Sequence, residues 1–190
     1  EGTEIIWLPV FDAERWAFMR DRESIVSSFQ ALVSEYDPRL LLFSSPDNPT
    51  SRLIPADVFD DILRIAEEAD CFVIVDFAYR AQCFTEVVPE HFSASPSEHP
   101  NLIRLHSNSK WCRGLGRRLG WVEAAPHVIE ALEIVQQSTA LCPDSVHQYA
   151  LAAYLTKALS DGSLQSYMNE TNARYEKAAR HTTECIDRYI

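Results

Sequence analysis

The sequence RLLLFSSPDNPT, residues 39–50, is a short apolar run that ends in a cluster of turn-forming residues. A run of this length that breaks into Pro, Asp and Asn is typical of a buried strand followed by a turn. Residues 71–75, CFVIV, repeat the buried-strand pattern and lead into Asp76 and Tyr79. We therefore expect two strands, each with polar side chains at its carboxyl end.

The segment between these strands, Pro55 to Ala69, has helical periodicity. A proline stands near its first turn, and its apolar residues share one helix face: Val58, Ile62, Ile65 and Ala66. A strand, a helix and a strand in this order predict a right-handed parallel crossover and an α/β fold. In such sheets ligands collect at the carboxyl ends of the strands, which would bring Asn48, Asp76 and Tyr79 to one rim.

Further elements follow from the same patterns. Strands are expected over Glu4–Leu8, Asn101–His106 and Arg118–Glu123, and helices over Glu23–Tyr36, His127–Thr139, Ser145–Leu159 and from Leu164 onward. The Asp161-Gly162-Ser163 turn separates the last two helices.

Residues 107–120, SNSKWCRGLGRRLG, follow the strand expected at 101–106. Lys110 is one of only three lysines, with Lys157 and Lys177, among seventeen basic residues. A short basic cluster is usually a solvated turn. The alternative is that Lys110 is a reactive amine that forms a Schiff base with a carbonyl, while nearby hydroxyls and a guanidinium hold an anion.

Three separated motifs occur in order: Asn48-Pro49-Thr50, Asp76-Phe77-Ala78-Tyr79, and Ser107-x-Ser109-Lys110 with Gly116-x-Arg118-x-Gly120. With these motifs the chain resembles the class I/II aminotransferases, which are fold-type I enzymes that use pyridoxal 5'-phosphate. The resemblance implies a three-layer αβα sandwich with a mostly parallel sheet. It also implies that the strand at Arg118–Glu123 runs antiparallel to its neighbours.

The resemblance assigns roles to the residues of these motifs. Lys110 would carry the cofactor as a Schiff base and then move the proton to and from the substrate's α-carbon. A free lysine has a pKa of about 10.4, so its surroundings would have to lower that pKa. Asp76 would pair with the pyridine nitrogen of the cofactor.

The remaining assignments concern the ring oxygen and the phosphate. Tyr79 and Asn48 would donate hydrogen bonds to the phenolic oxygen of the ring. Ser107, Ser109 and Arg118 would hold the phosphate, for which a planar guanidinium is well suited.

The chain departs from the family pattern at several positions. Ser51 stands where a glycine usually follows Asn-Pro-Thr, and Phe77 replaces an acidic or small residue. Within the lysine loop, Asn108, Arg113 and Gly114 occupy places that usually hold apolar or small residues. These changes put the substrate preference in doubt more than phosphate binding.

The resemblance also implies a domain organisation. Residues 1–160 would form part of the cofactor-binding large domain, and residues 161–190 a connecting helix toward a small domain. Family members are much longer than 190 residues. We therefore expect a fragment that is inactive alone, with the small domain and its substrate-binding arginine beyond Ile190.

Composition limits the classes of partner. The formal charge of -11 argues against non-specific binding to nucleic acid or anionic membranes. The sequence contains no apolar run of transmembrane length and no signal-like start. Five cysteines without a CxxC pair indicate free thiols in the cytoplasm, and the histidine spacing predicts no metal site. By the resemblance, the expected partners are amino acid and 2-oxo acid substrates and a second copy in a homodimer.

Amino transfer is not the only function that these motifs allow. The same cofactor chemistry serves lyases, decarboxylases and cyclases of this fold, and some aminotransferase-like domains bind the cofactor without catalysis. A different class is a serine hydrolase that uses Ser107 and Lys110 as a Ser-x-x-Lys pair. That enzyme would not need Asp76, Tyr79 or Arg118.

Overall fold

The structure of the chain is a computed structural model that describes residues 2–12, 14, 17–18, 21–84, 92–111, 118–141 and 144–189. The chain divides into two compact units. The first contains residues 1–76, 89–104 and 123–126, and the second contains residues 77–88, 105–122 and 127–190. This division differs from the expected domains, 1–160 and 161–190, which stay a prediction.

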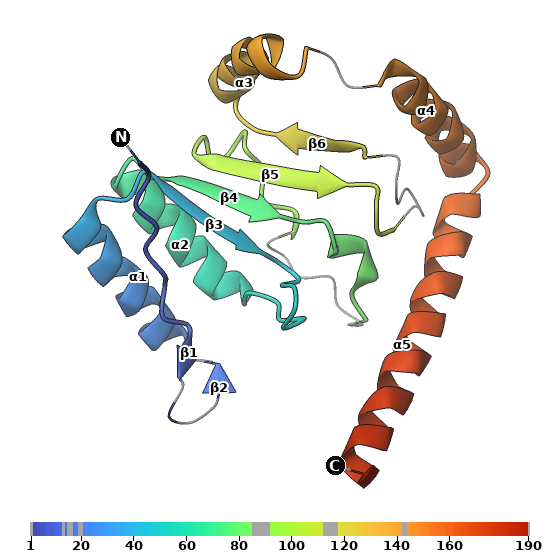
Figure 1. The fold of residues 1–190 in the computed structure, drawn as a ribbon, viewed down its shortest axis with the longest axis horizontal. Coiled ribbons are helices and arrows are strands. Elements are labelled where there is room, and N and C mark those ends of the chain that lie inside the picture. Colours follow the sequence, from blue (N-terminus) through green and yellow to red (C-terminus); the bar gives the residue numbers. More distant parts are fainter. Residues whose placement is uncertain are drawn as a thin grey trace. The chain divides into compact units, whose positions relative to one another are not determined.

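The first unit contains the expected strand-helix-strand crossover. Strand β3 (Leu40–Ser44) leads into helix α2 (Ala56–Glu68), which is followed by β4 (Phe72–Asp76). The two strands are parallel, with Leu40 opposite Phe72 and Ser44 opposite Asp76. Helix α1 (Arg22–Tyr36) lies beside α2 (Figure 1). Two short strands, β1 (Phe11–Asp12) and β2 (Ala17–Phe18), precede it as an antiparallel pair that the sequence did not predict.

One four-stranded sheet has the order β3-β4-β5-β6. Strand β5 spans Leu102–Ser107 and β6 spans Gly120–Glu123. Figure 1 shows that β6 runs in the direction opposite to β5. The α/β fold with a mostly parallel sheet and an antiparallel last strand is therefore confirmed.

Helices dominate the second unit. A single turn of 3-10 helix, η1 (Arg80–Gln82), comes soon after β4. The later helices are α3 (Pro126–Thr139), α4 (Ser145–Ser160) and α5 (Ser163–Tyr189), close to the expected ranges. The side chain of Asp144 starts α4 by accepting hydrogen bonds from the backbone N–H groups of Val146 and His147.

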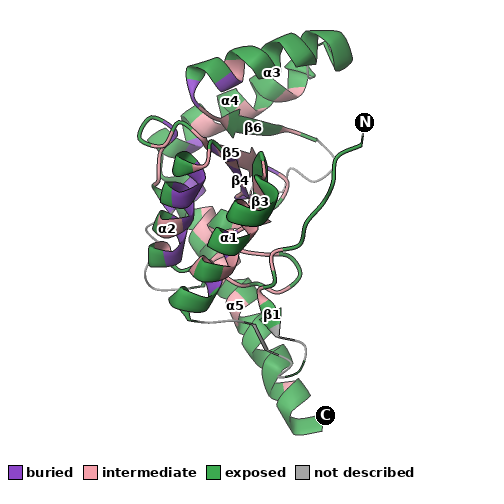
Figure 2. Ribbon diagram, turned by 90° about the vertical axis from the view of Figure 1, so that its left-hand side faces the viewer, coloured by how far each residue is buried: buried purple, intermediate pink, exposed green. Residues whose placement is uncertain are grey.

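The core of the first unit is built around α2 and β4. Figure 2 shows the buried face of α2, which carries the residues expected from the helical periodicity together with Phe59 and Leu63. The Phe59 ring meets the Phe43 ring edge to face, with centroids 6.1 Å apart. Val73 and Val75 of β4 are fully buried. The apolar face of the helix therefore covers the two parallel strands that end at Ser44 and Asp76.

The prediction of a strand over Glu4–Leu8 is wrong. Residues 4–8 form no strand in the described part of the chain, and the side chains of Ile5 and Trp7 are 73% and 83% exposed. Apolar residues alone do not make a strand, because the extended backbone also needs a neighbouring strand for its hydrogen bonds.

Cys71, Cys83 and Cys185 are free thiols. Burial raises the pKa of the Cys71 and Cys83 thiols, which makes them poor nucleophiles. Cys112 and Cys142 lie outside the described residues. Among the described residues, none of the helices has the length and apolar character needed to cross a bilayer.

Candidate functional site

The carboxyl ends of β3 and β4 place Asp76 next to the turn that carries Asn48. Ser44 is the register partner of Asp76, and the backbone N–H of Ser45 donates to the Asp76 carbonyl at 3.1 Å. Ser45 is fully buried, and its hydroxyl accepts the backbone N–H of Ile54 at 3.3 Å. The first unit therefore joins the Asn48 turn to the end of β4, as the strand pattern predicted.

The carboxylate of Asp47 organises the same turn. Asp47 Oδ1 accepts the Ser44 hydroxyl at 2.8 Å, and Oδ2 accepts both the hydroxyl and the backbone N–H of Thr50. Burial acts to raise the pKa of Asp47, but the hydrogen bonds from Thr50 and Ser44 outweigh it, and the pKa is lowered. Sequence reasoning missed Asp47, although an Asp flanked by Ser and Thr three residues away on each side is a known signal for a side-chain-capped turn.

In the second unit, the structure brings Tyr79 and Lys110 together. Lys110 Nζ lies 5.0 Å from the centroid of the Tyr79 ring, which is within cation–π range. Lys110 is exposed, and within the described part of the chain no carboxylate forms an ion pair with it. The amine is therefore accessible, and no acidic side chain among the described residues pairs with it.

The segment after Tyr79 is held by two further side chains that the sequence did not single out. Gln82 Nε2 donates to the carbonyl of Lys110 at 3.5 Å, a long hydrogen bond. Asn172 Nδ2 of α5 donates to the carbonyl of Ala81 at 2.8 Å. No local pattern reveals Asn172, because its partner is 91 residues away.

The serines of the lysine loop lie next to each other. The Ser107 hydroxyl accepts the backbone N–H of Ser109 at 3.2 Å, and the backbone N–H of Asn108 donates to the Leu119 carbonyl at 3.2 Å. Asn108 is buried, although the resemblance gives its place to an apolar or small residue. Arg118 is exposed and has a φ angle of 54°. Arg113, Gly114 and Gly116 lie outside the described residues.

Close packing fixes the strands that flank this loop. A Cβ atom at Gly120 would lie 2.6 Å from the backbone oxygen of His106, so only glycine fits there. The His106 ring stacks on Trp121, with centroids 5.1 Å apart, and lies 5.9 Å from the buried Phe77. Phe77, which departs from the family pattern, is therefore a packing residue below the loop.

Asn48 and Asp76 thus belong to the first unit, whereas Tyr79, Ser107, Ser109, Lys110 and Arg118 belong to the second. Each group is ordered by contacts within its own unit. The donor set of an accessible amine, a carboxylate, a phenol, an amide, two hydroxyls and a guanidinium fits a cofactor that carries an aldehyde, a pyridine nitrogen, a phenolic oxygen and a phosphate.

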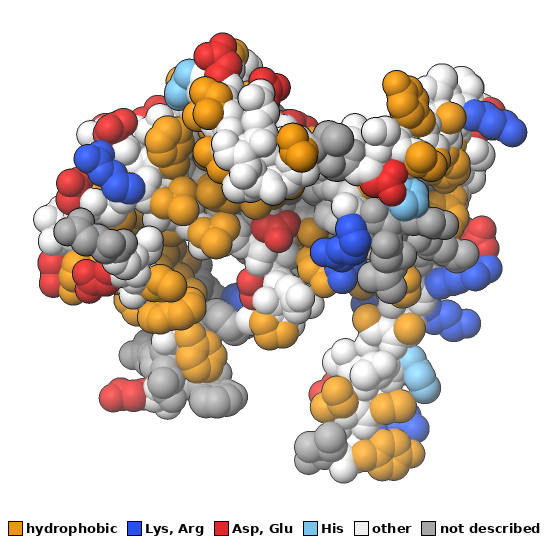
Figure 3. Space-filling view, turned by 45° about the horizontal axis from the view of Figure 1, so that its top comes forward, with side chains coloured by type: hydrophobic (Ala, Val, Ile, Leu, Met, Phe, Trp, Pro, Cys, Tyr) orange, Lys and Arg blue, Asp and Glu red, His pale blue; other side chains and the backbone are white. Residues whose placement is uncertain are grey.

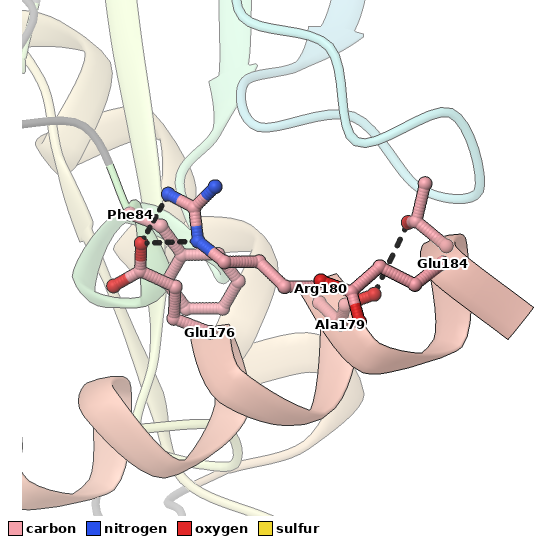
Figure 4. Close-up of a pocket in the computed structure, with 6 residues that line it drawn as sticks. Phe84, Glu176, Ala179, Arg180 and Glu184 are labelled. Carbon is pink, nitrogen blue, oxygen red and sulfur yellow. Dashed lines mark hydrogen bonds and ion pairs between the residues drawn. The ribbon is translucent and has the colours of Figure 1, made fainter.

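A surface hollow on the second unit involves none of the predicted site residues. It is lined by Phe84 and by one face of α5: Glu176, Ala179, Arg180, Thr183 and Glu184. Figure 4 shows the Arg180 guanidinium over the hollow, where its Nε and a terminal nitrogen donate to Glu176 Oε1 at 3.0 and 2.6 Å. Because the guanidinium is already paired, this hollow is a weaker candidate for anion binding than the lysine loop.

Comparisons with known proteins agree with the motifs. The sequence model of the family described as aminotransferase class I and II matches residues 16–188. The chain is 30% identical over 160 residues to the L-glutamine–4-(methylsulfanyl)-2-oxobutanoate aminotransferase of Bacillus subtilis, covering 84% of this chain and 37% of that protein. It is 34% identical over 143 residues to the histidinol-phosphate aminotransferase of Rhodococcus opacus, covering 72% and 33%.

Solved structures give the same fold. The aromatic aminotransferase from Pyrococcus horikoshii superposes with a TM-score of 0.77 and 25% identity, covering 94% of this chain and 46% of that one. An aspartate aminotransferase from Thermus thermophilus superposes with a TM-score of 0.70 at 20% identity. The chain spans about a third of the length of the curated relatives that it matches.

Proposed function

Because this chain belongs to the class I and II aminotransferase family, we propose that it supplies cofactor-binding residues for pyridoxal-phosphate-dependent transfer of an amino group between an amino acid and a 2-oxo acid. The observation that carries this proposal is the exposed Lys110 amine, held over the Tyr79 ring in the Ser-x-Ser-Lys loop. The bound cofactor supplies an aldehyde that condenses with amines and a ring that withdraws electrons from the substrate's α-carbon.

The side chains of this chain would then bind, orient and move protons. Lys110 Nζ would hold the cofactor through its aldehyde and would then move the proton at the substrate's α-carbon. The Asp76 carboxylate would accept a hydrogen bond from the protonated ring nitrogen, and the Tyr79 hydroxyl would donate to the ring oxygen.

The remaining residues hold the periphery of the cofactor. The Asn48 amide would donate to the ring oxygen, as Tyr79 would. Ser107, Ser109 and Arg118 would hold the phosphate, for which the planar guanidinium of Arg118 is well suited. The amino donor, the homodimer and the cytoplasmic location stay predictions from the family resemblance.

Reductive trapping tests this proposal, because the chain contains its own controls. The chain is incubated with pyridoxal phosphate and reduced with borohydride, and the labelled lysines are located by peptide mass mapping. Lys110, Lys157 and Lys177 are all exposed, so accessibility alone predicts similar labelling. We expect label predominantly on Lys110, together with an absorbance band near the visible edge that K110A abolishes and K157A retains. Equal labelling of the three lysines, or a band that survives K110A, would overturn the proposal.

The serine hydrolase has less support from the geometry. A Ser-x-x-Lys enzyme needs the lysine amine to take the serine proton. Here the Ser107 hydroxyl accepts the backbone N–H of Ser109, whereas Lys110 Nζ lies over the Tyr79 ring. Labelling of Ser107 by a fluorophosphonate would reverse this preference.

A further inference from the structure

We propose that Asp47 is a positioning residue that holds the Asn48 amide in the orientation needed to bind the cofactor. This inference rests on the proposed function, because it takes Asn48 as a cofactor ligand. Asp47 has no role in the motif that suggested the cofactor, and it precedes Asn48 directly in the chain.

The Asp47 side chain forms hydrogen bonds to residues on both sides of Asn48. One carboxylate oxygen accepts the hydroxyl of Ser44, the last residue of β3. The other accepts the hydroxyl and the backbone N–H of Thr50, two residues after Asn48. The carboxylate therefore bridges the chain before Asn48 to the chain after it.

The backbone of Asp47 closes the same turn. Its N–H donates to the Arg52 carbonyl at 2.8 Å, and its carbonyl accepts the N–H of Ser51 at 2.8 Å. Asp47 thus forms hydrogen bonds through both its backbone and its side chain with residues of the Ser44–Arg52 segment.

Asn48 lies between the two parts of the turn that the Asp47 carboxylate joins, so these hydrogen bonds fix the backbone from which its side chain extends. Hydrogen bonds to a carboxylate are roughly twice as strong as neutral ones, and Asp47 is half-buried, which limits competition from water. The turn is also joined to β4 through Ser45 and Asp76. Removing the carboxylate would release the Asn48 turn while leaving the strand pair intact.

The test is a double-mutant cycle on cofactor affinity. The apparent dissociation constant of pyridoxal phosphate is measured from reductive trapping at Lys110 for the wild type, D47A, N48A and the D47A/N48A double variant. We expect D47A to weaken affinity about tenfold, the effect of losing hydrogen bonds worth about 1.4 kcal/mol to a charged group. In the N48A background, D47A should have almost no further effect, because Asp47 acts through Asn48.

Two controls separate positioning from a loss of fold. D60A removes an exposed aspartate of α2 in the same unit and should leave the affinity unchanged. D47N keeps an oxygen that can accept a hydrogen bond from Thr50, so its cofactor affinity should lie between those of the wild type and D47A. Circular dichroism before cofactor is added should show the same secondary structure in every variant; a D47A chain that is unfolded at that point would overturn the inference.

The outcomes distinguish this inference from the proposed function. If D47A lowers the cofactor affinity by the same factor in the N48A background as in the wild type, Asp47 acts independently of Asn48. The inference is then wrong, while the proposed function stands. The inference also fails if N48A weakens binding and D47A does not. If N48A leaves the affinity unchanged and the three lysines are labelled equally, the proposed function itself is wrong.

Discussion

Ser51 has a φ angle of 58°, in the left-handed region that favours glycine. It occupies the place where a glycine usually follows Asn-Pro-Thr in the class I and II aminotransferases. The structure therefore gives the physical reason for that glycine: the backbone N–H of Ser51 reaches the Asp47 carbonyl only when the chain turns back at this residue. A serine is tolerated there at a cost in conformational energy.

Replacing Ser51 with glycine should relieve this cost. S51G is expected to raise the free energy of unfolding by about 0.5–1 kcal/mol, since the left-handed penalty exceeds the extra entropy that glycine gains in the unfolded chain. Urea denaturation followed by circular dichroism measures the change. S27G, at an exposed position in the interior of α1, is the matched control and should lower stability instead. A loss of stability in S51G would contradict the argument.

Gly120 is required for a different reason, the space available to it. G120A would push a methyl group against the backbone oxygen of His106, which cannot move without disturbing β5. We expect G120A to lower the free energy of unfolding by about 1–3 kcal/mol, the usual cost of overpacking. G2A is the control, because nothing lies within 4 Å of its added methyl group. Equal stability of the two variants in thermal unfolding would show that the β5–β6 contact is looser than described.

At the scale of elements, helix α2 follows most directly from its sequence. Its apolar positions recur with helical spacing, and Val58, Ile62, Ile65 and Ala66 are all buried as expected. The long helix α5 behaves differently. Ion pairs between residues four apart, Glu170–Arg174 and Glu176–Arg180, lie on its surface, and Leu164 is its only buried residue in the described part of the chain. Figure 3 shows hydrophobic side chains exposed toward its carboxyl end.

The packing of α2 on the strands can be tested at Phe59, which is fully buried. F59A should lower the free energy of unfolding by about 3–5 kcal/mol, because it leaves a cavity beside Phe43. The control F84A removes the same side chain where it is 41% exposed and should change stability by less than about 1 kcal/mol. Similar losses in the two variants, measured by urea denaturation, would show that α2 is not the main support of β3 and β4.

At the scale of the whole molecule, the chain combines a well-packed first unit with a second unit rich in exposed helix. Most of the buried apolar side chains belong to the first unit, and the second unit contributes Phe77, Val128, Ala158 and Leu164. Large apolar side chains remain exposed on α3 and α4, among them Ile134, Val135, Val146 and Tyr149.

Much of the fold could be predicted because its signals are local. The order of strands and helices from α1 to α5 follows from apolar periodicity, turn residues and caps, each read within about fifteen residues of sequence. The strand expected at residues 4–8 failed because a strand also requires a partner, which no local pattern supplies. The strand pair β1–β2 and the 3-10 turn η1 are too short to produce a periodic pattern of apolar residues in the sequence.

The sequence by itself determined the α/β class and the family and proposed which residues bind the cofactor, because these depend on residue type, order and spacing. Only the tertiary structure decided that Lys110 lies over Tyr79, that Asn172 holds Ala81 and that Asp47 bridges Ser44 to Thr50. These contacts depend on where the folded backbone places donors and acceptors, and the same side chains in another fold would face other partners.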